Sequence, residues 1–205
     1  MTQGSDQLRD ELKRVFRVSD MLTTCHSTLR DRYTRLSLAL DITILAASAC
    51  LVALAFADQQ VVGHLTIFGS SPSTTIGIFS LITFILSLFQ LRSDWKSRAV
   101  RFEYAAKAYA DVKTELRTAL LKNPPDEFEC HRLLNDYRAV GETVEAVPEN
   151  QFNRLKQKHL LKLRVSNVID ANPGTNIGII RLRMWLGDTW NVIRDKKISR
   201  GANDE

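Results

Sequence analysis

One carboxylate lies inside a long apolar stretch of this 205-residue chain. Asp41 is the only charged residue between Leu36 and Ala57. An ionisable side chain in such a stretch is costly and marks a candidate functional position. However, Asp41 lies near the start of the stretch, so it could instead reach the aqueous boundary or pair with Arg92, which follows the next apolar stretch. Two interpretations therefore stay open: a structural contact, or a role at a pore mouth or between copies.

Polar side chains also lie within the second apolar stretch, Leu65–Leu91, which contains no charged residue. They recur every three or four residues and share one side of a helix: Ser80, Thr83, Ser87 and Gln90. We call the first three the hydroxyl stripe. It could form hydrogen bonds between helices or line a water-filled path. Two helices cannot enclose a path, so lining requires several copies; packing is slightly favoured. Ser48 shares the Asp41 side of the first stretch and belongs to the same candidate set.

Small residues follow one side of the first apolar stretch. They are spaced four, three, four and three residues apart: Ala39, Thr43, Ala46, Cys50 and Ala53. Helices in lipid associate where small residues let their backbones approach closely. We expect this small-residue stripe to pack against the second apolar helix, which is a structural role.

The rest of the sequence lacks the motifs of common enzymes. It has no phosphate-binding loop, no H-E-x-x-H and no C-x-x-C. Two Cys-His pairs, Cys25-His26 and Cys130-His131, offer four zinc ligands by type, but adjacent helical residues point about 100° apart. We therefore expect no catalytic residue, no metal and no cofactor.

The elements that carry these residues are long enough to cross a bilayer, which takes roughly 20 helical residues. The first is preceded by 35 residues of mixed charge, unlike a signal peptide. Lys and Arg number seven in residues 1–35, none in 58–72 and 21 in 92–205. Because basic residues stay in the cytoplasm, both termini of a multi-pass membrane protein with this pattern should be cytoplasmic. Three scattered cysteines suit a reducing compartment.

These observations predict an all-α membrane protein, a two-span hairpin continuing into a cytoplasmic helical bundle. The expected divisions follow the chain: 1–35 a cytoplasmic N-terminal helix, 36–57 the first transmembrane helix, 58–72 an external loop, 73–91 the second transmembrane helix, 92–121 its cytoplasmic extension, and 122–205 a helical tail. Ser19-Asp20 could interrupt the N-terminal helix. No breaker follows residue 91, so residues 73–121 should form one helix about 70 Å long. Its apolar stripe should pack against the N-terminal helix.

The last predicted helix, Ile177–Ile198, combines Trp185 and Trp190 with basic residues. Such a helix could lie on a membrane surface. Docking on the cytoplasmic bundle is the favoured alternative, because the bundle also needs apolar cover.

The order of these segments resembles a known family. A basic helix, Leu29-Arg30-Asp31-Arg32-Tyr33, enters the first span, and the second span exits through Leu88-Phe89-Gln90-Leu91-Arg92-Ser93-Asp94-Trp95 into the Ala- and Tyr-rich residues 101–109. This resembles the SLATT family, two-transmembrane effector domains of bacterial nucleotide-signalling systems. Residues 148–159 are similar to its longer subgroup, found beside reverse transcriptases. The resemblance covers about residues 10–170.

The resemblance implies a membrane effector of an antiphage or conflict system that oligomerises and permeabilises the inner membrane. The implied partners are the lipid bilayer, further copies of the chain, and a regulatory protein or nucleotide-signalling partner encoded nearby. Residues 92–205 carry 16 acids against 21 bases, so we expect no direct binding of nucleic acid. The alternative is a non-conducting anchor or scaffold that tethers a soluble partner through its cytoplasmic helices.

Overall fold

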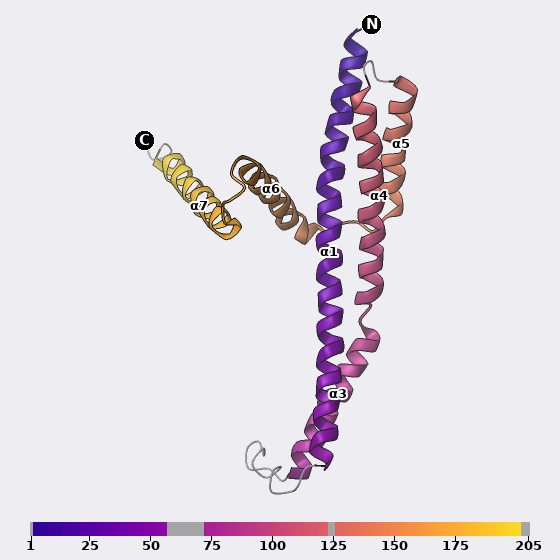
Figure 1. Ribbon diagram of the computed structural model, residues 1–205, viewed down its shortest axis with the longest axis vertical. Coiled ribbons are helices and arrows are strands. Elements are labelled where there is room, and N and C mark those ends of the chain that lie inside the picture. Colours follow the sequence, from indigo (N-terminus) through magenta and orange to yellow (C-terminus); the bar gives the residue numbers. More distant parts are fainter. Residues whose placement is uncertain (1, 57–71, 123–125, 202–205) are drawn as a thin grey trace. The chain divides into compact units, whose positions relative to one another are not determined.

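The computed structural model describes residues 2–56, 72–122 and 126–201 (Figure 1). In these ranges the chain forms helices and no strand, which confirms the all-α class. The helices are α1 (Thr2–Phe56), α3 (Pro72–Arg92), α4 (Trp95–Leu121), α5 (Glu127–Thr143), α6 (Glu149–Ala171) and α7 (Ile177–Gly201). They belong to two compact units, unit 1 (Met1–Ala146) and unit 2 (Val147–Glu205). The expected external loop, 58–72, lies outside the described residues except for Pro72.

Helix α1 runs without interruption from the N-terminal segment into the first apolar stretch. The break considered at Ser19-Asp20 does not form. Instead, the Asp20 carboxylate accepts a hydrogen bond from Lys113 on α4 at 2.6 Å. The hydroxyls of Thr23 and Thr24 donate to carbonyl oxygens one turn earlier, at Ser19 and Asp20. The polar residues near the expected break are therefore accommodated within a continuous helix.

The core of unit 1 lies where α1 packs along α4. The buried residues recur at three- and four-residue steps, as expected for two long helices in contact: Leu12, Val15, Cys25 and Leu29 from α1, and Phe102, Ala105, Tyr109, Val112, Leu116 and Ala119 from α4. Helix α5 adds Cys130 and Leu133 to the end of this core that contains Leu12. The N-terminal helix is thus the partner of the α4 stripe, as predicted.

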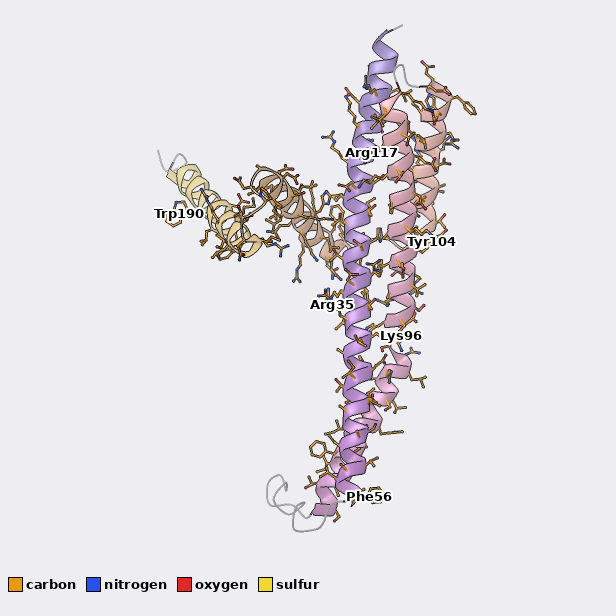
Figure 2. The ribbon with its side chains drawn as sticks, viewed as in Figure 1. Arg35, Phe56, Lys96, Tyr104, Arg117 and Trp190 are labelled. Carbon is orange, nitrogen blue, oxygen red and sulfur yellow. The ribbon has the colours of Figure 1, made fainter. Side chains whose placement is uncertain are left out.

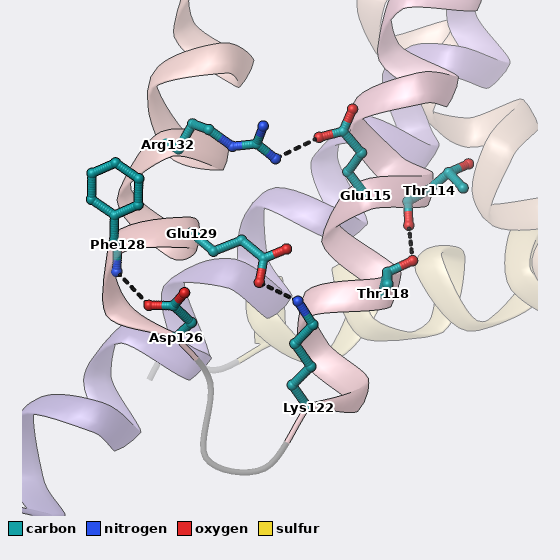
Figure 3. A network of polar contacts seen from close by, with 8 residues as sticks. All are labelled: Thr114, Glu115, Thr118, Lys122, Asp126, Phe128, Glu129 and Arg132. Carbon is teal, nitrogen blue, oxygen red and sulfur yellow. Dashed lines mark hydrogen bonds and ion pairs between the residues drawn. The ribbon is translucent and has the colours of Figure 1, made fainter.

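Ion pairs join the C-terminal part of α4 to the first turns of α5, and a capping carboxylate lies at the start of α5 (Figure 3). Lys122 pairs with Glu129 at 2.5 Å, and Arg132 pairs with Glu115 at 3.2 Å. The Asp126 side chain accepts a hydrogen bond from the backbone N–H of Phe128, which caps α5. A side-chain cap satisfies a backbone donor that the first turn of a helix leaves open.

Unit 2 consists of α6 and α7, which contact each other. Helix α6 begins directly after Pro148, and an Asn176 side chain accepts a hydrogen bond from the Gly178 N–H at the start of α7. Arg164 on α6 pairs with Asp188 on α7 at 2.7 Å. The predicted helix Ile177–Ile198 is therefore confirmed as α7, which ends slightly later, at Gly201.

Candidate functional site

The most apolar parts of α1 and α3 lie on the surface. None of the most apolar 18 residues of α1 is buried, and only 6% of the corresponding part of α3 is. Exposed side chains include Leu45 at 72% and Phe56 at 88% of their full area. Soluble monomers rarely expose contiguous apolar surface on this scale. Among the described residues the structure thus contains two helices that are long and apolar enough, by length and composition, to span a membrane.

The contact between α1 and α3 uses a different side of α1 from the one predicted. All members of the small-residue stripe are exposed: Ala39, Thr43, Ala46, Cys50 and Ala53. The half-buried positions are Leu40, Ile44, Ala47, Leu51 and Leu54. The expected seam is therefore replaced by one made mainly of branched aliphatic side chains, which offer more contact area to the second helix.

Asp41 joins three helices at one end of the apolar pair. Its carboxylate accepts a hydrogen bond from the Gln90 amide of α3 and pairs with the Lys96 ammonium of α4 at 2.9 Å. Asp41 is 31% exposed and Lys96 is 75% exposed. Of the alternatives considered for Asp41, a structural ion pair does form, but with Lys96, one turn further along the chain than Arg92. We call Asp41, Gln90 and Lys96 the junction cluster.

The junction cluster borders an open pocket of about 370 Å³. Its lining is mostly polar and comes from α1, α3, α4 and the residues between the last two: Ser37, Leu40, Asp41, Ser87, Gln90, Leu91, Ser93, Asp94, Trp95 and Lys96. Carboxylate, amide, hydroxyl and ammonium groups here can hold water or an ion beside the apolar pair. This pocket is the candidate functional site of unit 1.

The single helix expected over 73–121 is interrupted, so that prediction is wrong. Ser93 and Asp94 separate α3 from α4. The Ser93 hydroxyl donates to the Gln90 carbonyl at 3.2 Å, and Asp94 pairs with Arg101 at 3.3 Å. Trp95 then packs edge-on against Phe89, with ring centroids 5.7 Å apart. Short polar side chains that bond to nearby backbone compete with helix formation, and this interruption brings Lys96 to Asp41.

The hydroxyl stripe and Ser48 of α1 divide between two environments. Thr83 and Ser87 are half-buried, whereas Ser80 and Ser48 are exposed. The hydroxyls of Thr83 and Ser87 each donate at 2.9 Å to a carbonyl one turn earlier in α3, and Ser48 does the same in α1 at 2.8 Å. These hydroxyl donors are satisfied within their own helices, and the hydroxyl oxygens can still accept hydrogen bonds. Of the predicted polar set, Asp41, Ser87 and Gln90 come together at the junction.

Sequence reasoning missed Lys96 and Ser93 at this site. A signal for Lys96 was present, because several cations follow the second apolar stretch and any of them could reach Asp41. Which one does so depends on the interruption at Ser93-Asp94, since a break changes the direction in which later side chains point. The Ser-Asp dipeptide alone does not predict such a break, because the same dipeptide at Ser19-Asp20 lies within a continuous helix and Asp94 makes no capping hydrogen bond to α4.

A second group of polar and aromatic side chains lies in the bundle of unit 1. His26 is 1% exposed and stacks on Tyr109, with ring centroids 5.5 Å apart. Its Nδ1 has no hydrogen-bond partner among the described residues. Burial lowers the pKa of His26 to about 4, although the Glu145 carboxylate acts in the opposite direction. Burial also raises the pKa of the Cys25 thiol. This group stabilises the bundle as neutral side chains.

In the part of the chain that the structure describes, no three His, Cys, Asp or Glu side chains gather closely enough to hold a metal ion. Comparison of the chain with known protein families, with curated proteins and with solved structures finds no match. The fold and the site define an all-helical protein with two exposed helices that could cross a membrane and a polar cluster where those helices meet a bundle.

Proposed function

We propose that the chain is a membrane effector of a bacterial antiphage or conflict system, which oligomerises and permeabilises the inner membrane. The observation that carries the membrane part is the continuous exposure of the apolar surfaces of α1 and α3, whereas α1 and α4 bury an apolar core between them. A bilayer supplies the apolar surroundings that these surfaces lack. The antiphage role and the SLATT family membership rest on the sequence resemblance.

The proposed topology places both termini in the cytoplasm, because the basic residues flank the apolar helices and avoid residues 58–72. The junction cluster then lies at the cytoplasmic boundary of the bilayer. Its charged groups can reach water there, which avoids most of the cost of a charge in lipid. In this position the cluster could couple a movement of the bundle to the spans.

Oligomerisation is part of the proposal because two helices cannot surround a path. The exposed small-residue stripe of α1 is available for close contact between copies. Exposed Ser80 could face water in such an assembly. The trigger would be a regulatory protein or a nucleotide-signalling partner that acts on the cytoplasmic helices.

The test is uptake of a membrane-impermeant dye by bacteria after induced expression of the full chain. Ser80→Leu combined with Ser87→Leu should abolish uptake while the protein stays in the membrane, because the stripe then becomes aliphatic. A matched control changes two exposed serines outside the apolar helices, Ser97→Leu and Ser166→Leu, and should leave uptake unchanged. Uptake that persists in the first double variant contradicts a path lined by this stripe.

The alternative function, a non-conducting anchor or scaffold, is favoured by one observation. Thr83 and Ser87 satisfy their hydroxyl donors within α3, so these donors do not need water or a second helix. An anchor should tolerate replacement of the α1 and α3 apolar segments by an unrelated apolar hairpin. Retained partner binding with no dye uptake in either form would support the anchor.

A further inference from the structure

The excess positive charge of the chain is confined to unit 2. Residues 1–146 contain 17 Lys and Arg and 17 Asp and Glu, so unit 1 is formally neutral. Residues 147–205 contain 11 basic and six acidic residues, which equals the whole +5 of the protein. A concentration of charge in two helices favours a partner that is itself an extended anionic surface.

Helix α7 adds an exposed apolar side to this charge. Five large apolar residues are 54–70% exposed: Ile179, Leu182, Trp185, Leu186 and Trp190. At 100° per residue they fall within an arc of about 140°, and Figure 2 shows Trp190 projecting from the helix. Ile180, outside that arc, is 6% exposed. The exposed side combines tryptophans with aliphatic residues, and Arg181 and Arg183 lie near its edges.

A pocket between α6 and α7 has the same mixed chemistry. It holds about 350 Å³ and is lined by apolar and polar side chains: Leu160, Leu161, Trp185, Lys156, Arg164, Asp188, Asn153 and Gln157. Arg164 is paired with Asp188 at 2.7 Å, whereas Lys156 is exposed beside the apolar wall. An apolar wall with cationic and amide groups matches the boundary between a phosphate headgroup and an acyl chain.

We propose that unit 2 docks on the surface of a bilayer and binds anionic phospholipid headgroups through the α6–α7 pocket and the exposed side of α7. Tryptophan prefers the membrane–water interface because its ring is apolar and its N–H is polar. Each Lys or Arg near an anionic surface strengthens binding about fivefold. The inference rests on the proposed function only in that the spans bring a bilayer close to unit 2.

The test uses the full chain in nanodiscs of zwitterionic lipid, or of the same lipid with one third phosphatidylglycerol. Lipids brominated on their upper acyl carbons quench tryptophans that enter the interface. The difference between the natural chain and a Trp185→Phe, Trp190→Phe variant isolates the α7 signal from that of Trp95. We expect at least twofold stronger quenching of the α7 signal in anionic discs, and loss of that increase in 0.5 M NaCl.

Charge reversal on unit 2 provides the matched comparison. Lys156→Glu, Arg181→Glu and Arg183→Glu together should lower the ratio of docked to undocked unit 2 by about 100-fold or more. The control makes the same number of reversals at exposed positions of unit 1: Lys107→Glu, Arg117→Glu and Arg138→Glu. It should leave quenching unchanged. Equal quenching in both disc types, or in both triple variants, overturns the inference.

Further outcomes separate this inference from the proposed function. Incorporation into discs is scored independently, so an inserted chain without α7 quenching overturns docking and leaves membrane insertion standing. A chain that fails to insert contradicts the proposed function, and its flotation with anionic but not neutral vesicles then decides docking. If the quenching of the α7 tryptophans by brominated lipid falls as protein concentration rises and does not depend on anionic lipid, a second copy of the chain covers the exposed side of α7. That result overturns the inference.

Discussion

At the scale of single residues, the Asp41–Lys96 pair should be worth little in free energy but should set a local geometry. Lys96 is 75% exposed, and exposed ion pairs contribute at most about 1 kcal/mol. Lys96→Glu places two carboxylates together and should speed tryptic cleavage after Arg92 severalfold, as read by mass spectrometry. Asp41→Lys added to Lys96→Glu should restore the natural rate. Lys107→Glu is the control, and no difference between Lys96→Glu and Lys107→Glu would contradict the role of this pair.

A second residue-scale consequence concerns pH. His26 is neutral in the folded bundle, with a pKa of about 4, and its unfolded-state pKa is about 6.5. As pH falls through 6.5 the unfolded chain takes up the proton first, so stability is lost between pH 6.5 and 4. Across this pH range the free energy of unfolding should fall by about 3 kcal/mol, because each unit of pKa difference between the folded and unfolded states is worth about 1.36 kcal/mol.

The corresponding variant is His26→Phe, which keeps a ring against Phe102 and Tyr109 and cannot take up a proton. Thermal unfolding of the full chain in detergent, followed by circular dichroism at pH 7.5 and 4.5, should show a larger acid destabilisation in the natural chain than in the variant. Carboxylates titrate in both proteins, so the difference isolates His26. Parallel pH profiles would show that burial of this imidazole does not govern the acid response.

At the scale of elements, the interruption between α3 and α4 should depend on two side chains. Ser93→Ala with Asp94→Ala raises helix propensity by roughly 1 kcal/mol in total and removes the bonds to Gln90 and Arg101. The helix should become continuous, and amide exchange of residues 93–96 should slow about tenfold by mass spectrometry. Ser97→Ala, already inside α4, should change nothing. Unaltered exchange in the double variant would mean that packing, rather than local propensity, sets the break.

The elements also show how far the sequence could be interpreted. Three- and four-residue periodicity predicted the long α1 and its packing on α4, because a repeated apolar stripe needs one continuous partner. The break at Ser93-Asp94 escaped that reasoning, since two residues of weak helix propensity do not disturb a periodicity. The α1–α3 contact was misplaced for a different reason. Small residues favour close helix contacts without specifying which helix, and the aliphatic side around Ile44 packs on α3 instead.

At the scale of the whole molecule, the sequence separates three kinds of surface along one chain. Unit 1 combines a neutral bundle with exposed apolar helices, and unit 2 carries the net charge. An exposed apolar surface of this extent needs either lipid or another protein to cover it. Lipid and a protein partner differ in how strongly they disfavour a charged side chain on this apolar surface, because the interior of a bilayer offers neither water nor counterions.

The last prediction uses that difference. Leu45→Lys with Val52→Lys places two charges in the middle of the first apolar helix, each at a cost of about 3 kcal/mol in a bilayer. The matched control is Val100→Lys with Tyr104→Lys on α4, because these side chains are 65% and 62% exposed while Leu45 and Val52 are 72% and 59% exposed. The carbonate-resistant membrane fraction of the full chain should fall at least tenfold in the first variant and stay unchanged in the second. An equal change of the membrane fraction in both double variants would mean that α1 and α4 have the same surroundings. That result would contradict the proposal that the apolar part of α1 spans the membrane.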